Sequence, residues 1–466
     1  MRRLRKTYKS VLSGGLTSAF LLCTVAFASA ESMGDAVRKA LTTNPAQKAL
    51  AADVNATGYE LLQSKSEFLP TLDVTGEIGG EVVSNPNVLA VSDSGRLNNT
   101  RQVAVSIGLT LFDGWRRANT IFRNASRLDG RIYRFLAASE TVALSTVEAY
   151  IDVVRHRQMM GLARKNVTRH LEIGRSVRER ISGGKSSVGE GFQIDERIAA
   201  AKDAVIGVES ALLDANAAYV RVVGHEPRGH LKVPHIHHVP STKDALISAS
   251  LRSNTSIKEA DKLVAEADYD REIVNAERYP NISLNGRSSV GADRSGSRGR
   301  EVDGFFGLNL SWRLYGGGLR KKQLAALSER ELQAQYQRDD RRRDVKEVAV
   351  LTWNAYTKGL KRVKVLKSQL ESNKMLVSSY IQEFELSKRT LLDVLDVQRA
   401  EFNTEVQLVS ARAALQFSKF RMLAAQSKLA QHFGVDVSEL AFEPDFEDRL
   451  LDRPRDIFNI DLEPLR

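Results

Sequence analysis

Hydrophobic and polar residues alternate with a period of two in four segments of the chain, at residues 71–82, 102–112, 281–290 and 305–315. In the second segment Val103, Val105 and Ile107 alternate with Ala104 and Ser106. This period is typical of a β-strand with one apolar and one polar face. A soluble antiparallel sheet with one wet face would show it. So would tilted strands that cross a bilayer, for which about ten residues suffice.

Two features of these segments favour the membrane interpretation. A polar, turn-rich loop joins each pair of predicted strands, over residues 83–100 and 291–304. The polar faces also carry charged residues, such as Asp73, Glu77 and Arg287, which suit a water-filled lumen. Known barrels begin at about eight strands, so four strands cannot close a barrel alone. Three copies of the chain would supply twelve.

Most of the remaining sequence has the period of an α-helix. Apolar residues follow a heptad spacing at Val363, Leu366 and Leu370, and no proline interrupts residues 115–181. We predict two long helices that end at about 182 and 385, and shorter helices at about 35–68, 187–223, before 281 and at about 391–432. A helix of about seventy residues spans about 100 Å. If the shorter helices stack end to end beside the long ones, they form the wall of a helical barrel. A coiled-coil stalk without a channel is the alternative, and the paired strands argue against it.

The two halves of the chain resemble each other. The segment 44–70 aligns with 254–280 without a gap, and Leu111-Phe112-Asp113-Gly114 corresponds to Leu314-Tyr315-Gly316-Gly317. We therefore interpret the chain as an internal duplication that completes its architecture with further copies of itself. The predicted parts are a signal peptide at 1–30, a first repeat at 31–230, a linker at 231–243, a second repeat at 244–440 and a polar C-terminal tail at 441–466.

The first thirty residues have the pattern of an export signal. A basic start precedes an apolar run, and Ala28-Ser29-Ala30 offers a cleavage site before Glu31. The single cysteine, Cys23, lies in this segment, so the processed chain is predicted to carry no thiol.

Charge and motifs exclude several function classes. Of the formal net charge of +11, five cations belong to the signal segment, and the basic run 341–343 has acids beside it. This indicates a solvated helix face rather than a nucleic-acid site. The run 183–186 resembles the end of a phosphate loop, but Glu179 stands where that motif needs glycine. We find no catalytic constellation. We therefore expect no enzyme activity and no cofactor.

The reversals between predicted helices carry candidate functional residues. Ser187 with Glu190, and Thr390 with Asp393, have the spacing of a capping box. Capping alone would explain both acids, but it does not explain Asp396, which lies three residues after Asp393 on the same helix face. Around a threefold axis, Asp393 and Asp396 would form carboxylate rings that favour cations.

Two other groups of residues are candidates for a role. Aromatic residues at the strand ends would form a membrane-interface girdle: Phe112, Trp115, Trp312 and Tyr315. Several histidines crowd the linker region and are weak candidates for a metal site, chiefly His235, His237 and His238. An exposed linker is the commoner origin of such a tract, so no metal is predicted.

The run from Phe384 to Gln398 resembles the second-repeat signature of the TolC outer membrane factors, and the likeness extends over residues 31–440. The resemblance implies a mixed α and β membrane protein. Each chain would give four strands to a trimeric twelve-stranded transmembrane β-barrel, continued by a long α-helical coiled-coil barrel. Its function would be a passive exit duct for tripartite efflux or type I secretion. A non-conducting structural coiled-coil protein, periplasmic or attached to the surface, is the alternative.

The resemblance also implies partners, location and site roles. The partners would be further copies in a homotrimer, a periplasmic adaptor (membrane fusion) protein, an inner-membrane RND or ABC transporter, and outer membrane lipid. The location would be the outer membrane, with a large periplasmic portion. Asp393 and Asp396 match the acids of the periplasmic entrance, and Arg389, Glu190 and Phe384 match positions of the network that closes it. Phe384 stands where a well-studied member has tyrosine, so one hydroxyl of that network is absent.

Overall fold

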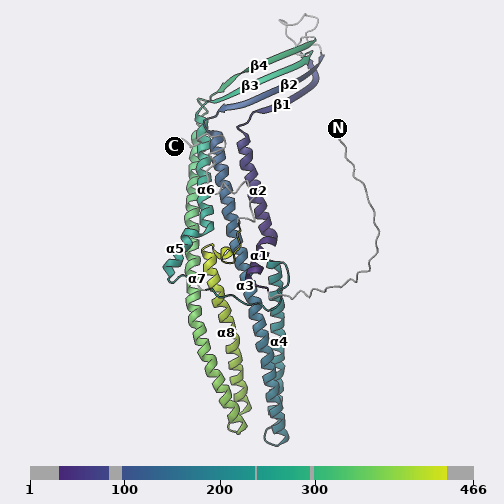
Figure 1. Ribbon diagram of the computed structural model, residues 1–466, viewed down its shortest axis with the longest axis vertical. Helices are drawn as coiled ribbons and strands as arrows, with labels where there is room; N and C mark the ends of the chain where they lie inside the picture. The colour runs from purple at the N-terminus through teal and green to yellow at the C-terminus, as the bar shows by residue number, and fades with distance from the viewer. Residues whose placement is uncertain (1–30, 83–96, 237–238, 294–298, 438–466) are drawn as a thin grey trace, which may run out of the picture.

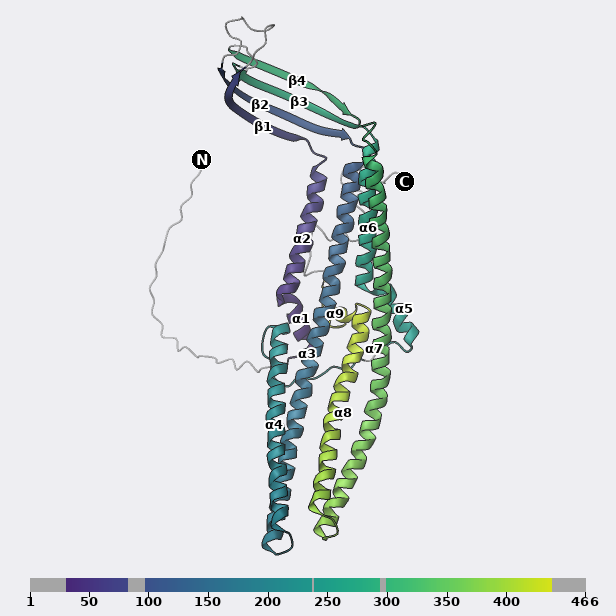
Figure 2. The ribbon, with the colours of Figure 1, turned by 180° about the vertical axis from the view of Figure 1, so that it is seen from behind.

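The computed structural model describes residues 31–82, 97–236, 239–293 and 299–437, which form one long rod with a β-sheet at one end (Figures 1 and 2). Two helical hairpins form the opposite end, which we call the tip. The predicted signal peptide, most of the predicted loop at 83–100, residues 294–298 of the predicted loop at 291–304 and the predicted C-terminal tail lie outside the described residues.

Two helices of 67 residues each, α3 (Arg116–Ser182) and α7 (Leu319–Glu385), run the length of the rod. At about 1.5 Å per residue each spans about 100 Å. In the half toward the tip, α4 (Val188–Val223) packs on α3 and α8 (Leu391–Ala425) packs on α7. In the half toward the sheet, α2 (Pro45–Ser66) and α6 (Thr255–Asn275) continue the same lines. Shorter helices therefore do stack end to end beside the long ones.

No helix in the described part of the chain combines the length and the apolar character that a membrane span needs.

The predicted helix at 35–68 is interrupted at Asn44, which separates α1 (Met33–Thr43) from α2. Asn44 has extended backbone angles (φ −63°, ψ 123°), and its side chain accepts a hydrogen bond from the Ala46 N–H. Asn254 has nearly the same angles (φ −64°, ψ 124°) between α5 (Lys243–Ser253) and α6. Asparagine caps a new helix at both positions because its carbonyl pairs a first-turn N–H group. The two residues that align in the sequence thus have the same conformation.

The predicted helix at 391–432 was also too long, because α8 ends at Ala425 and a short α9 (Leu429–His432) follows. Ser427 between them has a left-handed backbone, with a φ of 51°. Its hydroxyl accepts a hydrogen bond from the Thr255 N–H at the start of α6. This contact between distant segments fixes the break, so local periodicity could not predict it.

Four antiparallel strands form one sheet in the order β1 (Thr71–Val82), β2 (Leu97–Phe112), β3 (Asn281–Ala292) and β4 (Arg300–Ser311). The predictions for β1 and β3 were close. β2 begins at residue 97 rather than 102, where Leu97 pairs with Val82. The prediction of 305–315 for β4 was displaced, because the chain leaves the sheet after Ser311 and turns through Gly317 and Gly318 into α7. A short 3₁₀ turn, η1 (Ala276–Arg278), connects α6 to β3.

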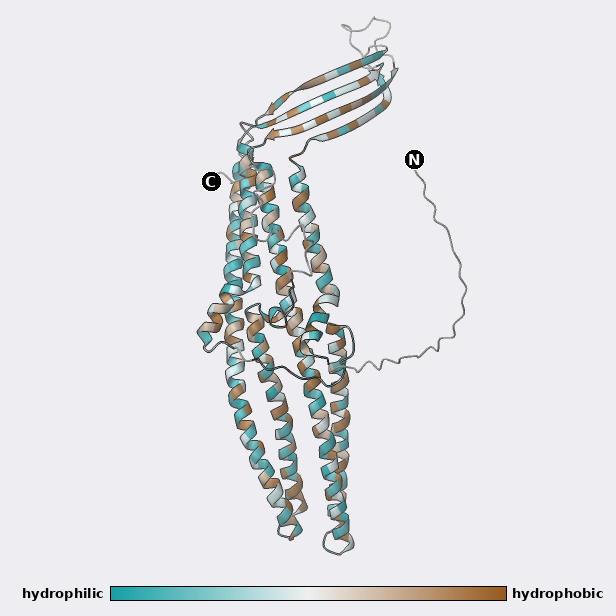
Figure 3. Cartoon of the chain, in the orientation of Figure 1, coloured by the Kyte–Doolittle hydropathy of each residue, from teal (hydrophilic) through white to brown (hydrophobic). Residues whose placement is uncertain are grey.

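The strand register gathers the apolar residues of all four strands on one face. Leu72 pairs with Ile107, which pairs with Gly286, which pairs with Phe306. Figure 3 shows the resulting alternation of apolar and polar positions along each strand. The apolar face is exposed, with 69% of Leu72, 74% of Phe306 and 63% of Leu310 accessible. A contiguous apolar face of this extent marks a surface that meets lipid or another protein.

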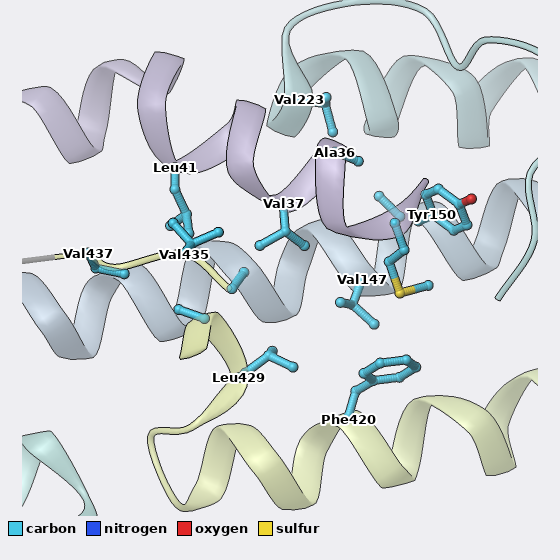
Figure 4. Close-up of a cluster of buried hydrophobic side chains, with 14 of the residues drawn as sticks. Ala36, Val37, Leu41, Val147, Tyr150, Val223, Phe420, Leu429, Val435 and Val437 are labelled. Atoms are coloured by element: carbon cyan, nitrogen blue, oxygen red, sulfur yellow. The ribbon is translucent and has the colours of Figure 1, made fainter. Parts of the chain in front are cut away.

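The largest core lies at mid-length of the rod, where α1, α3, α4, α8, α9 and the linker after α4 meet. Figure 4 shows Val147 of α3 between Val37 of α1 and Phe420 of α8, with Tyr150 of α3 to one side, beside α1. The last described residues also pack here, with Val437 in the same cluster. We call this region the equatorial core.

A buried carboxylate anchors the C-terminal segment to α3 beside this core. Glu140 accepts hydrogen bonds from the backbone N–H groups of Leu429 (2.9 Å) and Ala430 (3.1 Å). Burial raises the pKa of Glu140 from 4.5 to about 7, although both N–H donors favour the ionised form. The buried site therefore favours the neutral acid.

This raised pKa predicts that the anchor weakens as pH rises. The folded pKa is above the ordinary value, so its stabilisation is complete below pH 4.5 and is lost as pH rises through about 7. The loss is at most about 3.5 kcal/mol, from about 1.4 kcal/mol for each of about 2.5 units of pKa. Hydrogen exchange at the Leu429 and Ala430 amides, corrected for intrinsic rates, should show protection that falls over this range. Glu140→Gln should remove the pH dependence, and equal slopes in both proteins would refute the assignment.

Candidate functional site

The junction between sheet and helices is held by one buried arginine. Arg117, in the first turn of α3, is 4% exposed and donates to the Asp113 carboxylate at 2.9 Å. It also donates to the backbone carbonyls of Glu67 (3.1 Å) and Thr110 (2.9 Å), and its guanidinium lies 4.3 Å from the Phe68 ring centroid. One side chain thus fixes the end of α2, the end of β2 and the start of α3 relative to one another.

The chain turns from β2 into α3 through two consecutive residues with left-handed backbone, Gly114 (φ 67°) and Trp115 (φ 66°). A Cβ on Gly114 would lie 2.4 Å from the Ala276 carbonyl oxygen, so only glycine fits this turn. The corresponding turn into α7 uses two glycines, Gly317 and Gly318. A left-handed backbone is unfavourable for Trp115 and is not unfavourable for Gly318, which holds the corresponding position. Trp115 packs against other aromatic rings.

The four predicted girdle residues all lie at this junction, where the sheet meets the helices. Phe112 and Trp115 pack edge to face with ring centroids 5.1 Å apart, and both contact Tyr279. Trp312 donates from its indole nitrogen to the Arg278 carbonyl oxygen at 3.1 Å. Tyr315 is 87% exposed and joins no ring cluster among the described residues. Sequence reasoning missed Tyr279, which precedes β3 rather than following a strand.

At the tip, both hairpins turn in the same way. Gly184 (φ 68°) follows α3, and Ser387 (φ 57°) follows α7. In each turn the next residue donates its N–H back to the last helical turn, from Lys185 to the Arg180 oxygen at 2.7 Å and from Lys388 to the Glu383 oxygen at 2.8 Å. This pairing satisfies carbonyl groups that a helix end leaves free.

Both predicted capping boxes are present. Ser187 and Glu190 exchange hydrogen bonds at the start of α4, and Thr390 and Asp393 do so at the start of α8. The hydroxyl and N–H of Thr390 both donate to Asp393, which holds the pKa of this carboxyl below its ordinary value. Asp393 is therefore ionised at neutral pH, and its charge is part of the cap.

Asp396 takes no part in the cap. It lies one turn after Asp393 and is exposed, with its carboxylate 3.7 Å from the Arg399 guanidinium. The tip thus presents two neighbouring carboxylates, of which the second is exposed and has only the nearby Arg399 guanidinium as a charged neighbour.

Arg389 pairs within its own hairpin. Its Nε donates to Glu383 at 2.7 Å, and its guanidinium lies 4.2 Å from the Tyr380 ring centroid. The hydrogen bond from Arg389 lowers the pKa of the Glu383 carboxyl. Among the described residues, the ion pair of Arg389 is thus with an acid of its own hairpin rather than of the neighbouring one. A pairing with another copy stays a prediction.

Arg180 joins the two hairpins, and sequence reasoning did not identify it. It donates to the Glu385 carbonyl oxygen (3.3 Å) and to the Ser387 hydroxyl (3.0 Å), across from α3 to the turn after α7. Its guanidinium also lies 4.7 Å from the Phe384 ring centroid. The same hydrogen bond closes both hairpin turns, and it is accepted by Arg180 in one turn and by Glu383 in the other. Arg180 and Glu383 therefore hold equivalent positions. The sequence signal that could have identified Arg180 is this difference, an arginine in one turn where the other turn has an acid.

Phe384 lies in an apolar cluster that connects the same two hairpins. It is 7% exposed and shares this cluster with residues from α3, α4 and α8, among them Val177, Ile194 and Leu391. Farther from the tip, Arg169 of α3 reaches two buried acids of α8, Glu401 at 3.3 Å and Glu405 at 3.9 Å. Within one chain the hairpins are thus held together by packing and by arginines of α3.

No metal site appears in the described part of the linker or elsewhere in the described residues, where no three His, Cys, Asp or Glu side chains group suitably. His225 lies 3.3 Å from the Glu31 carboxylate. His235 makes other contacts, and His237 and His238 lie outside the described residues.

Comparisons with known proteins agree on one family. The family model for outer membrane efflux proteins matches residues 36–225 and 246–425. The chain is 22% identical to the outer membrane efflux protein BepC of Brucella suis, over 93% of this chain and 94% of that protein. It is 21% identical to the outer membrane protein TolC of Vibrio cholerae, over 94% of this chain and 98% of that protein.

Solved structures show the same fold. The outer-membrane channel OprN superposes with a TM-score of 0.73 at 16% identity, over 85% of this chain and 89% of that one. The outer membrane protein VceC of Vibrio cholerae superposes with a TM-score of 0.72 at 15% identity, over 85% of this chain and 96% of that one.

The turn after α3 yields a prediction for stability. A Cβ at Gly184 would meet no atom within 4 Å, so Gly184→Ala adds only the cost of a left-handed backbone, about 1 kcal/mol. Gly189→Ala in the first turn of α4 is the matched control, and there alanine should be neutral or stabilising. Denaturant unfolding of the purified protein measures both changes. A destabilisation by Gly189→Ala as large as that by Gly184→Ala would contradict this account.

Proposed function

Because the chain belongs to the outer membrane efflux protein family, we propose that three copies form a channel-tunnel that serves as a passive exit duct. The duct would work in a tripartite efflux pump, in type I secretion or in both. A periplasmic adaptor protein and an inner-membrane RND or ABC transporter would be its partners and would supply the energy. The two names that describe efflux or export among the similar proteins, BepC and the pyoverdine export protein OpmQ of Pseudomonas aeruginosa, support this assignment.

The observation that carries the proposal is the exposed apolar face of the sheet. The side chains on this face include Val74 (68% exposed), Ile78 (81%) and Leu308 (67%), which a water-soluble sheet would bury. The opposite face carries Asp73, Glu77 and other polar residues. An apolar face outside and a polar face inside are what a strand in a membrane barrel requires.

The sheet edges give the reason for assembly. β1 and β4 each pair with one neighbour only, so each leaves one row of backbone N–H and C=O groups unpaired. In lipid an unpaired backbone group costs several kcal/mol, and only a closed barrel leaves no edge. If β4 of one copy pairs with β1 of the next, three copies close a ring of twelve strands. The exposed aromatic residues at the junction, including Trp312 and Tyr315, would then lie at the membrane interface.

The rod of helices would continue this barrel into the periplasm, and its tip would be the entrance. In a trimer Asp393 and Asp396 would form two carboxylate rings that favour cations. The closed entrance would depend on the Arg180 contacts and the Phe384 cluster within each chain, and on Arg389 and Glu190 between copies. The absence of a hydroxyl on Phe384 is offset by its burial against the Arg180 guanidinium.

Planar bilayers test the channel directly. The purified protein should have three times the subunit mass by light scattering, give steady single-channel steps and prefer cations. Asp393→Asn with Asp396→Asn should lower the cation-to-anion permeability ratio severalfold, whereas Asp396→Glu should preserve it because the charge remains. A well-folded trimer that gives no steps would refute the duct. Unchanged selectivity in the double variant would refute the carboxylate rings alone.

The closed state yields a separate prediction. Arg180→Gln removes the contacts between the two hairpins and should raise the resting conductance severalfold. Arg389→Ser should raise it as well if Arg389 also pairs with a neighbouring copy. Arg178→Gln is the control, because Arg178 pairs with Asp195 inside a single hairpin. If the Arg178 and Arg180 variants conduct alike, the contacts of Arg180 do not hold the entrance closed.

A further inference from the structure

A basic cavity of about 640 Å³ opens at mid-length of the rod between α3, α8 and the linker that follows α4. The basic side chains that line it are Arg155, Arg157, His230, Lys232 and Arg412. No carboxylate is among its described lining residues. We call it the equatorial basic cavity.

Part of this positive charge lacks a partner. Arg157 is used by the linker, because it donates to the Gly229 and Pro227 carbonyl oxygens at 2.7 and 3.2 Å. Arg155 lies 2.6 Å from Asp152. Within the described chain, Lys232 and Arg412 form no ion pair. Like charges gathered without a counter-charge repel one another, so the cavity favours an anionic occupant.

Two lining groups also lack hydrogen-bond partners. The Arg155 Nε donor and the Gln416 Oε1 acceptor are buried and unpaired. Buried polar groups in native proteins are almost always paired with protein or with water, so these two atoms leave one donor and one acceptor for a water molecule or for an occupant of the cavity. A carboxylate and a peptide N–H would satisfy both.

The apolar lining indicates which kind of anion fits. Ile151 and Leu231 line the cavity and belong to the equatorial core. Val435 and Val437, the last apolar residues before the C-terminal segment, pack in that same core. The cavity and the end of the described chain therefore both adjoin the equatorial core.

The chain itself contains a matching segment. Residues 438–466 carry nine acidic residues and four arginines, together with apolar residues such as Phe442, Phe446 and Leu450. At about 3.3 Å per extended residue, even ten residues would reach about 33 Å from Val437. The acidic residues of this segment match the basic lining of the cavity, and its apolar residues match the apolar lining. The segment also starts within reach of the cavity.

We propose that the acidic C-terminal segment, residues 438–466, docks in the equatorial basic cavity. Its carboxylates pair with Lys232 and Arg412, and its apolar residues extend the equatorial core. Since the cavity is lined by both α3 and α8, docking braces the two hairpins against each other at mid-length. The proposal does not depend on conductance, so it can fail while the channel assignment holds.

Disulfide cross-linking tests the docking, because the processed chain is predicted to have no native cysteine. Gln416→Cys is combined in turn with Asp445→Cys, Asp452→Cys or Asp461→Cys in the full-length mature protein. Gln333→Cys is the matched control, because it lines another cavity, one that carries Glu329 and Asp340 instead of cations. We expect at least one pair with Gln416→Cys to cross-link at least tenfold more than its Gln333→Cys counterpart under mild oxidation. Gel mobility then tells whether the segment docks in its own chain or in a neighbouring copy.

Charge reversal decides whether the cations hold the segment. Lys232→Glu with Arg412→Glu should lower the cross-linking yield severalfold, and Asp445→Lys with Glu447→Lys should restore it. As a check free of cysteines, deletion of residues 441–466 should raise hydrogen exchange in 230–233. Equal yields at Gln416→Cys and Gln333→Cys, or yields that ignore the charge reversal, would overturn the proposal. Unchanged exchange after the deletion would overturn it too, and would leave the cavity to another anion.

Discussion

Backbone polar groups must be hydrogen-bonded wherever water is absent, and this constraint governs both ends of the molecule. At the sheet, β1 and β4 each leave one row of groups unpaired beside an exposed apolar face. In the proposed duct this sheet lies in lipid, where a single chain leaves its two edges unpaired and neighbouring copies would pair them. At the tip, the helix ends lie in water, and each hairpin satisfies its own groups through a capping box and a left-handed turn.

The two halves of the chain share an order of elements but differ in the contacts that hold the junction between sheet and helices. The turn into α3 is clamped by Arg117 and Asp113, which are almost fully buried. The position of Asp113 is taken by Gly316 in the turn into α7, and Arg320, at the position of Arg117, lines an open cavity instead. Removal of one partner of a buried ion pair strongly destabilises a protein, because the other charge is left buried without a counter-charge. The first half thus fixes its sheet junction with a buried ion pair that the second half lacks at the corresponding positions.

Much of this architecture follows from patterns that are local in the sequence. A period of two placed β1 and β3 closely, and the heptad spacing at Val363 and Leu366 predicted a long helix there. The capping boxes at Glu190 and Asp393 were predictable because a cap needs only residues three apart. The family resemblance rested on the same short-range signals around Asp393, and it carried the entrance roles of Asp396 and Arg389, which stay predictions.

Contacts between distant segments were decided only by the tertiary structure. Ser427 ends α8 because its hydroxyl meets the first N–H of α6, and Glu140 acquires its raised pKa because the C-terminal segment covers it. Arg180 joins the hairpins because α3 and α7 end side by side, although about two hundred residues separate it from Ser387 in sequence. By itself the sequence determined which residues share a face in each strand and where the capping boxes of α4 and α8 lie, since these depend on near neighbours. The pairing of side chains across the rod depends on packing, which no local pattern encodes.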